Sequence, residues 1–222
     1  MIFSSFNGER KMQRKIFECC LLVLCMSLFA FAQEEPAPPA PEVFNPVKAV
    51  MSANLTTAKG KKVKGSEVLA GKKFIAFYFS AHWCGPCRAF TPELVKFRDK
   101  CAQKGLPFEV VFVSSDKTEN DMFNYMKEAD MKWYALPYGS KVYSEIQNHF
   151  KVGGIPHLTL LNGKGKVVSD NARWDVAMLG LKAYERWQSP NYKPLTYDDF
   201  KKKTQKNDTK NDQKNKKKKK SN

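Results

Sequence analysis

Two runs of apolar residues mark the centre of the predicted fold. They span Phe74 to Phe79 and Phe108 to Val113, and both are almost entirely apolar. Strands that are buried on both faces show such continuous runs, whereas half-exposed strands alternate apolar and polar residues. The pattern therefore predicts two central strands that are covered on both sides.

Helical periodicity follows each of these runs. After the first run, apolar residues recur every three or four positions, as on one face of a helix, at Phe90, Leu94, Phe97 and Cys101. Asp116, with Glu119 three residues later, is typical of a helix start. The apolar stripe of that second helix consists of Met122, Met126 and Ala129. Two more helices are predicted over residues 140–150 and 174–187.

Antiparallel elements complete the pattern. Residues 158–161 and 166–169 flank the turn sequence Asn-Gly-Lys-Gly, which predicts a hairpin. Residues 54–64 around Lys59-Gly60 predict a short hairpin at the sheet edge. Alternating strands and helices that end in an antiparallel hairpin indicate an α/β fold, with a central mixed β-sheet flanked by helices on both faces.

The amino-acid composition is consistent with this predicted α/β domain. Hydrophobic residues make up 42% of the 222 residues, which is enough for a packed core. The formal net charge is +16, but residues 201–222 alone contribute +9 through eleven lysines and two aspartates. Residues 33–200 carry only +5. The basic character therefore belongs to a tail and indicates no specific nucleic-acid partner.

The two ends of the chain differ from the predicted domain. Residues 1–32 read as a signal peptide: basic residues precede an uncharged run from Cys19 to Ala32, and Ala30-Phe31-Ala32 fits a cleavage site. An uncleaved anchor is the alternative. We expect a Pro-rich linker over 33–46, the folded domain over 47–192 and a Lys-rich disordered tail over 193–222. Because of the predicted signal peptide, we expect the protein to be exported, to the periplasm in a bacterium and otherwise to the secretory pathway or outside the cell.

A Cys-x-x-Cys pair lies where the first predicted strand gives way to a helix. Cys84 at a helix N-terminus is surrounded by unpaired N–H groups, which favour the thiolate form. Gly85 and Pro86 suit the first helical turn, and Cys87 lies on the same face as Cys84 and can form a disulfide with it. The pattern predicts that Cys84 is exposed and attacks, while Cys87 is shielded and resolves the mixed disulfide.

The cysteines have two other interpretations. The pair would be half of a zinc site if a second paired motif existed, but only Cys101 and three histidines remain in the body of the chain. We therefore expect no metal. Cys101 continues the apolar stripe of its helix and is predicted to be a core residue.

The sequence resembles the thioredoxin superfamily, and more narrowly its tryparedoxin/nucleoredoxin-like branch. The segments that carry the resemblance are FYFSAHWC at 77–84, Arg88, FTPEL at 90–94, VVFVSSD at 110–116, WYALPY at 133–138 and FKVGGIP at 150–156. The resemblance covers residues 55–188 and implies a thioredoxin-like fold. It also implies a cis peptide bond at Ile155-Pro156 facing Cys84, beside a substrate groove formed with Trp83, Gly85 and Pro86.

The sequence departs from that branch at two positions. Gly85 stands where the branch usually has Pro, and His157 where Thr usually follows the cis proline. Tyr78 occupies the place of the buried acid of ordinary thioredoxins, as it does in the branch. Charged forms of His82, His157 and Arg88 beside Cys84 would lower its pKa, although solvated or surface roles are the alternative.

The resulting hypothesis is an exported thiol–disulfide oxidoreductase that reduces protein disulfides through Cys84 and Cys87. It needs no cofactor beyond this redox-active disulfide. Its expected partners are disulfide-containing proteins and an unidentified electron donor, with weak contact between the Lys tail and an anionic surface, and the protein is expected to be a monomer. The alternatives are a non-catalytic peptide-binding module and a disulfide oxidase or isomerase.

Overall fold

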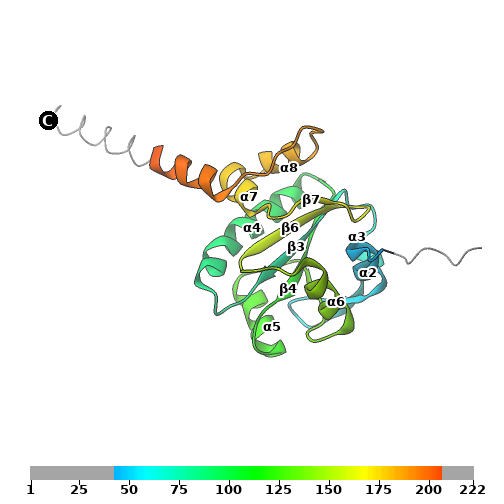
Figure 1. Ribbon diagram of the computed structural model, residues 1–222. Helices are drawn as coiled ribbons and strands as arrows, with labels where there is room; N and C mark the ends of the chain where they lie inside the picture. The colour runs from blue at the N-terminus through cyan, green and yellow to red at the C-terminus, as the bar shows by residue number, and fades with distance from the viewer. Residues whose placement is uncertain (1–42, 207–222) are drawn as a thin grey trace, which may run out of the picture. The chain divides into compact units, whose positions relative to one another are not determined.

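The computed structural model describes residues 43–206 (Figure 1). The predicted signal peptide, most of the linker and the last sixteen residues of the tail, 207–222, lie outside the described residues. None of the helices in the described range is long and apolar enough to cross a membrane.

The described residues form one mixed sheet of seven strands in the order β2-β1-β5-β4-β3-β6-β7. The strands are β1 Asn54–Thr56, β2 Lys62–Lys64, β3 Phe74–Ser80, β4 Phe108–Ser114, β5 Tyr134–Ala135, β6 His157–Asn162 and β7 Val167–Ser169. β3, β4 and β5 are mutually parallel, whereas β6 runs antiparallel to β3 and pairs with β7. The predicted α/β class with a mixed sheet is confirmed.

Helices cover both faces of the sheet (Figure 1). They are α2 Pro46–Ser52, α3 Gly65–Leu69, α4 Gly85–Gln103, α5 Glu119–Glu128, α6 Lys141–Phe150, α7 Arg173–Leu179 and α8 Lys182–Trp187. Every residue of β3 and β4 is buried, as their apolar runs predict. One core contains Tyr78 and side chains of α4, α5, α7 and α8, and the other contains Phe77 and side chains of α2, α3 and α6.

Two helix predictions are wrong in detail. Helix α5 begins at Glu119 with the Thr118 side chain accepting the Asp121 N–H, so Asp116 is not its cap. The helix expected over 174–187 is interrupted at Gly180, which has a φ of 53° and donates its N–H to Val176. Glycine adopts this left-handed backbone easily, so α7 ends there and α8 follows in a new direction.

The C-terminal boundary also differs from the expectation. Residues 197–206, expected to belong to the disordered tail, form a helix that we call the C-terminal helix. The Thr196 hydroxyl accepts the Asp199 N–H at 3.3 Å and Asp199 accepts the Thr196 N–H at 3.0 Å, which is a capping box. Tyr197 and Phe200 pack on Trp174 with ring centroids 5.3 and 5.1 Å away. These contacts hold a segment whose composition alone suggests disorder.

Candidate active site

Cys84 and Cys87 form a disulfide at the N-terminal end of α4. Cys84 is the N-cap residue, and its sulfur accepts the Cys87 N–H at 3.2 Å. β3 is buried on both faces and ends at Ser80. The chain leaves the sheet there, so the pair lies at the carboxyl end of this central strand. Cys84 is 6% exposed and Cys87 is fully buried. The prediction that Cys84 is exposed is therefore wrong for this disulfide form: both cysteines are buried, because Ile155 packs against the pair.

The loop before β6 faces this pair. Its Ile155–Pro156 peptide bond is cis, and the Ile155 carbonyl oxygen lies 3.7 Å from the Cys84 sulfur. The Arg173 guanidinium donates to the Pro156 carbonyl at 3.0 Å and stacks on the Trp174 ring, with 4.0 Å to its centroid. The chain that immediately precedes the sheet strand β6 is therefore tied to helix α7.

Trp83 is the large exposed side chain of the site. It is 58% exposed, and its indole N–H donates to the Ser115 carbonyl at 3.0 Å. The ring therefore stands in a fixed position beside the disulfide while remaining open to solvent. Gly85 and Pro86, next to it, are also exposed. These three residues give the site an accessible, largely uncharged rim.

His82 and Arg88 are engaged with neighbouring groups. The His82 imidazole Nε2 lies 2.9 Å from the Glu128 carboxylate, and the His82 backbone N–H donates to Asp116 at 2.7 Å. The Arg88 guanidinium donates to the His82 carbonyl. Both side chains therefore hold the segment that leads into Cys84. Glu128 offsets the charge that a protonated His82 would bring.

His157 lies in a different environment. Burial lowers its pKa below the usual value, and the charge of Arg173 lowers it further, while Asp170 at 3.8 Å acts in the opposite direction. The imidazole is therefore neutral at pH 7, because its ordinary pKa of about 6.5 is already below that pH. A neutral ring brings no positive charge to the Cys84 sulfur.

A chain of buried hydroxyl groups extends beneath the pair. The Thr91 hydroxyl bonds with Tyr78 at 2.8 Å, with Tyr125 at 2.6 Å and with the Cys87 carbonyl at 2.9 Å. Burial, then the neighbouring Tyr125, raises the pKa of Tyr78, so the phenol stays protonated. Tyr78, in the position of a buried acid, thus supplies a neutral polar group and no negative charge.

The remaining cysteine of the described segment is a core residue, as predicted. Cys101 is fully buried on the inner face of α4, and burial raises its pKa to about 12. A thiol with such a pKa is not reactive at neutral pH. Within residues 43–206 no group of three or more His, Cys, Asp or Glu side chains is arranged to hold a metal ion.

The structure brings Cys84, Cys87, Trp83, Ile155 and Pro156 together, with His82 and Arg88 supporting the entry to α4. Sequence reasoning missed the supporting residues Asp116, Glu128 and Arg173. A signal existed for Asp116, because it lies two residues after the end of β4, and the carboxyl ends of parallel strands lie at the same end of the sheet. Arg173 had no such signal, since it is seventeen residues from Pro156.

A Cys-x-x-Cys disulfide that caps the helix after a central strand, opposite a cis proline, defines a thioredoxin-like site. The Thioredoxin-like family model matches residues 71–167. The crystal structure of a thioredoxin from Wuchereria bancrofti is 41% identical, with a TM-score of 0.54, over 62% of this chain and 95% of the other. Tryparedoxin from Trypanosoma brucei is 34% identical, with a TM-score of 0.55, over 66% of this chain and its own full length, 100%.

The chain belongs to the thioredoxin superfamily, in its tryparedoxin/nucleoredoxin-like branch. Among curated proteins, probable nucleoredoxin 1 of Arabidopsis thaliana is 40% identical over 138 residues, which are 61% of this chain and 23% of that protein. Human nucleoredoxin is 35% identical over 132 residues, covering 59% of this chain and 29% of the relative. The chain thus spans about a quarter of the length of these curated relatives.

Proposed function

We propose that this protein reduces disulfide bonds in other proteins, with Cys84 as the attacking thiol and Cys87 as the resolving thiol. The observation that carries the proposal is the Cys84–Cys87 disulfide at the N-terminus of α4, with the Cys87 N–H donating to the Cys84 sulfur. After reduction, the same N–H and the helix dipole stabilise a thiolate on Cys84.

The proposed reaction has two exchange steps. The Cys84 thiolate attacks one sulfur of the substrate disulfide, forms a mixed disulfide and releases the other substrate sulfur as a thiolate. Cys87, after losing its proton, attacks the Cys84 sulfur, closes the Cys84–Cys87 disulfide and releases the second substrate thiolate. Two electrons pass from the dithiol to the substrate, and a separate dithiol donor must reduce the pair again.

The surroundings of the pair support a protein substrate. The exposed Trp83 ring and the Ile155 carbonyl, 3.7 Å from the Cys84 sulfur, offer an apolar surface and a backbone acceptor to an extended substrate chain. The uncharged Gly85-Pro86 sequence between the cysteines favours a reducing poise. We expect a potential nearer to thioredoxin, about −270 mV, than to strong oxidants, about −120 mV.

We also propose that the protein works outside the cytoplasm. The support is the sequence of residues 1–32, with its basic start, its uncharged run and its small-residue cleavage site. The reductase role and the export are separate proposals, and each has its own test.

Trapping experiments test the roles of the two cysteines. A Cys87→Ser variant should accumulate mixed disulfides with protein substrates, because nothing resolves them, whereas Cys84→Ser should form none. Wild-type protein should reduce insulin with turnover when a dithiol donor is present, and both variants should lose this turnover. A Cys101→Ser variant is the matched control, since Cys101 is buried away from solvent and should turn over like wild type.

The reverse trapping pattern would overturn the assignment of the two thiols. If neither variant forms adducts and the wild type does not turn over, the protein is a peptide-binding module. A measured potential near that of strong oxidants would instead make it an oxidase or isomerase.

A further inference from the structure

A cavity separate from the redox site lies beside the edge of the sheet that carries β1 and β2. It has a volume of about 480 Å³ and lies between the turn of the β1–β2 hairpin and the segment that joins α5 to β5. None of the residues that line it belongs to the Cys84–Cys87 site. Its size is within the range of about 300–1,000 Å³ that is usual for small-molecule sites.

The floor of the cavity is apolar. Met126, Met131 and Trp133 lie beneath it and are only 0%, 2% and 1% exposed, so the accessible apolar surface comes chiefly from Ala58 and the aliphatic stems of the lysines. The methionine side chains are flexible and polarisable and adapt to ligands of different shape. The indole N–H of Trp133 is buried and has no hydrogen-bond partner among the described residues.

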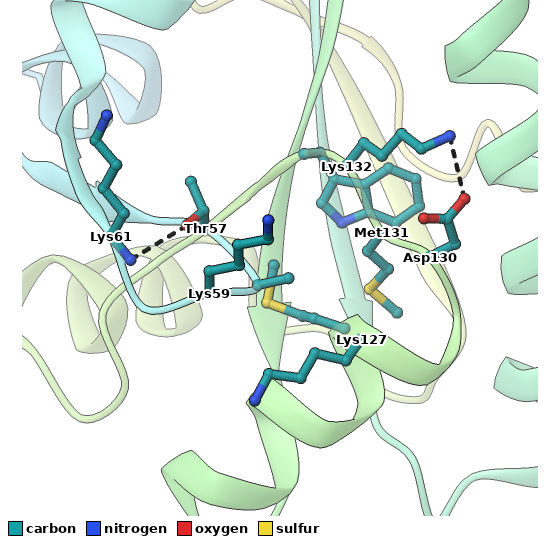
Figure 2. A pocket seen from close by; sticks show the side chains of 10 residues that line it. Thr57, Lys59, Lys61, Lys127, Asp130, Met131 and Lys132 are labelled. Atoms are coloured by element: carbon teal, nitrogen blue, oxygen red, sulfur yellow. Dashed lines mark hydrogen bonds and ion pairs between the residues drawn. The ribbon is translucent and has the colours of Figure 1, made fainter.

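The rim of the cavity is cationic. It carries Lys59, Lys61, Lys127 and Lys132 against a single carboxylate, Asp130, which gives a net charge of +3. Figure 2 shows Lys132 turned toward Asp130, and its ammonium group lies 3.1 Å from that carboxylate and 3.0 Å from Asp99. Within the described segment, Lys59, Lys61 and Lys127 form no ion pair with a carboxylate.

The hairpin turn fixes one side of this rim. The Thr57 hydroxyl accepts the Lys61 N–H at 3.2 Å, and the Thr57 carbonyl accepts the Gly60 N–H at 2.9 Å. Gly60 has a φ of 75°, which other residues rarely adopt, so the turn is specified by its sequence. The turn thereby places Lys59 on one side of the cavity, and Lys127 of α5 lines it from another element (Figure 2).

We propose that this cavity binds a small amphiphilic anion. Its aliphatic or aromatic body would pack on Ala58 and the lysine stems, above Met126, Met131 and Trp133, and its carboxylate, sulfonate or phosphate group would lie between Lys59 and Lys127. The apolar lining favours a ligand with an apolar part, and the ammonium groups without a carboxylate partner favour a ligand with a negative charge. The proposal does not depend on the redox activity, because the two sites share no residue.

The test uses the full chain and the fluorescent probe 8-anilinonaphthalene-1-sulfonate, which combines an aromatic body with one sulfonate. We expect one saturable site per chain, weaker binding at high salt, and a shift of the Trp133 indole N–H signal in NMR spectra on binding. Octanoate should displace the probe. Acetate, which lacks the body, and octanol, which lacks the charge, should not displace it at the same concentration.

Matched variants locate the site. The double variant Lys59→Gln with Lys127→Gln should bind the probe about tenfold more weakly, as expected for the loss of two partly screened ion pairs. The control variant Lys164→Gln with Lys166→Gln removes the same charge from exposed lysines elsewhere and should change binding less than about twofold. Circular dichroism checks that both are folded.

Three results would overturn the proposal. The first is equal weakening in both double variants, which would mean a general effect of charge. The second is displacement by acetate or octanol as effective as that by octanoate. The third is the absence of saturable binding, or binding that shifts the signals of Trp83 and leaves those of Trp133 unchanged.

Discussion

The Cys84 sulfur has two roles, because it caps helix α4 and forms half of the disulfide. When the disulfide opens, the Cys87 N–H still points at the Cys84 sulfur, and a negative charge there gains more from this donor than a neutral thiol does. No charged side chain is needed for this stabilisation. The local backbone geometry of the Cys-x-x-Cys turn supplies it.

His157 illustrates how burial changes a residue's role. A histidine beside the cis proline suggests, in the sequence, a positive charge next to the reactive thiol. In the folded protein its pKa is lowered, chiefly by burial, so the imidazole is neutral at pH 7. The unfolded chain therefore binds a proton at His157 more readily than the folded chain does, and this makes stability depend on pH.

Replacing His157 with Thr, the residue usual in the branch, should flatten that dependence. In the wild type, the contribution of the neutral His157 to the free energy of unfolding is fully present above its unfolded-state pKa of about 6.5. It is lost as the pH falls toward and through the lower pKa of His157 in the folded state. Urea unfolding at pH 7.5, 6.0 and 5.0 measures the difference. The exposed and non-titrating Asn148, replaced by Gln, is the control and should keep the wild-type slope. Equal slopes in wild type and His157→Thr would contradict the prediction.

At the scale of elements, the C-terminal helix shows how a few apolar residues order a polar segment. Tyr197 and Phe200 are one helical turn apart and both rings lie on Trp174 of α7, while the Lys203 ammonium group donates to the Met178 carbonyl. Trp174 also carries the Arg173 guanidinium that bonds to Pro156. The helix is therefore connected, through two residues of α7, to the loop that faces Cys84.

Removing the two rings should release this helix. The double variant Tyr197→Ala with Phe200→Ala should lose about 1–3 kcal/mol of stability, since each aromatic pair contributes about 0.5–1.5 kcal/mol beyond its buried area. Hydrogen–deuterium exchange should show loss of protection over 197–206. Lys202→Ala, a substitution at an exposed position of the same helix, should leave protection unchanged. A double variant that stays protected would mean that the helix does not depend on Trp174.

At the scale of the whole molecule, charge and sequence pattern separate the ends from the domain. The net charge is +16 for the full chain but +5 for residues 33–200, so the domain itself is only mildly basic. The uncharged run from Cys19 to Ala32 is fourteen residues long, shorter than the roughly twenty needed to span a bilayer as a helix. This length favours a cleaved signal over an anchor.

We expect the mature protein to begin at Gln33. N-terminal sequencing of protein isolated from its native host measures this directly. Ala32→Trp should block cleavage, because the site requires small residues, whereas Ala37→Trp in the Pro-rich segment should not. Retention of residues 12–32 on the native protein would contradict the prediction.

The sequence by itself determined the buried strands β3 and β4, the helix that carries the Cys pair and the mixed α/β class. These depend on local patterns: continuous apolar runs, a helical stripe and Cys84 at a strand-to-helix junction. The same patterns say little about short elements. Helices α2 and α3 and strand β5 were missed, because two to seven residues are too few to show a periodicity.

Only the tertiary structure decided which distant residues meet. It placed Arg173 on the Pro156 carbonyl, Glu128 on His82, and Tyr197 and Phe200 on Trp174. It also brought Lys59 of the hairpin turn, Lys127 of α5 and Trp133 to one cavity. A periodic pattern tells which face of an element is buried, but not against which other element it packs. That choice, and with it the protonation state of His157, follows from the packing of the whole chain, because burial and contact arise only when distant segments come together.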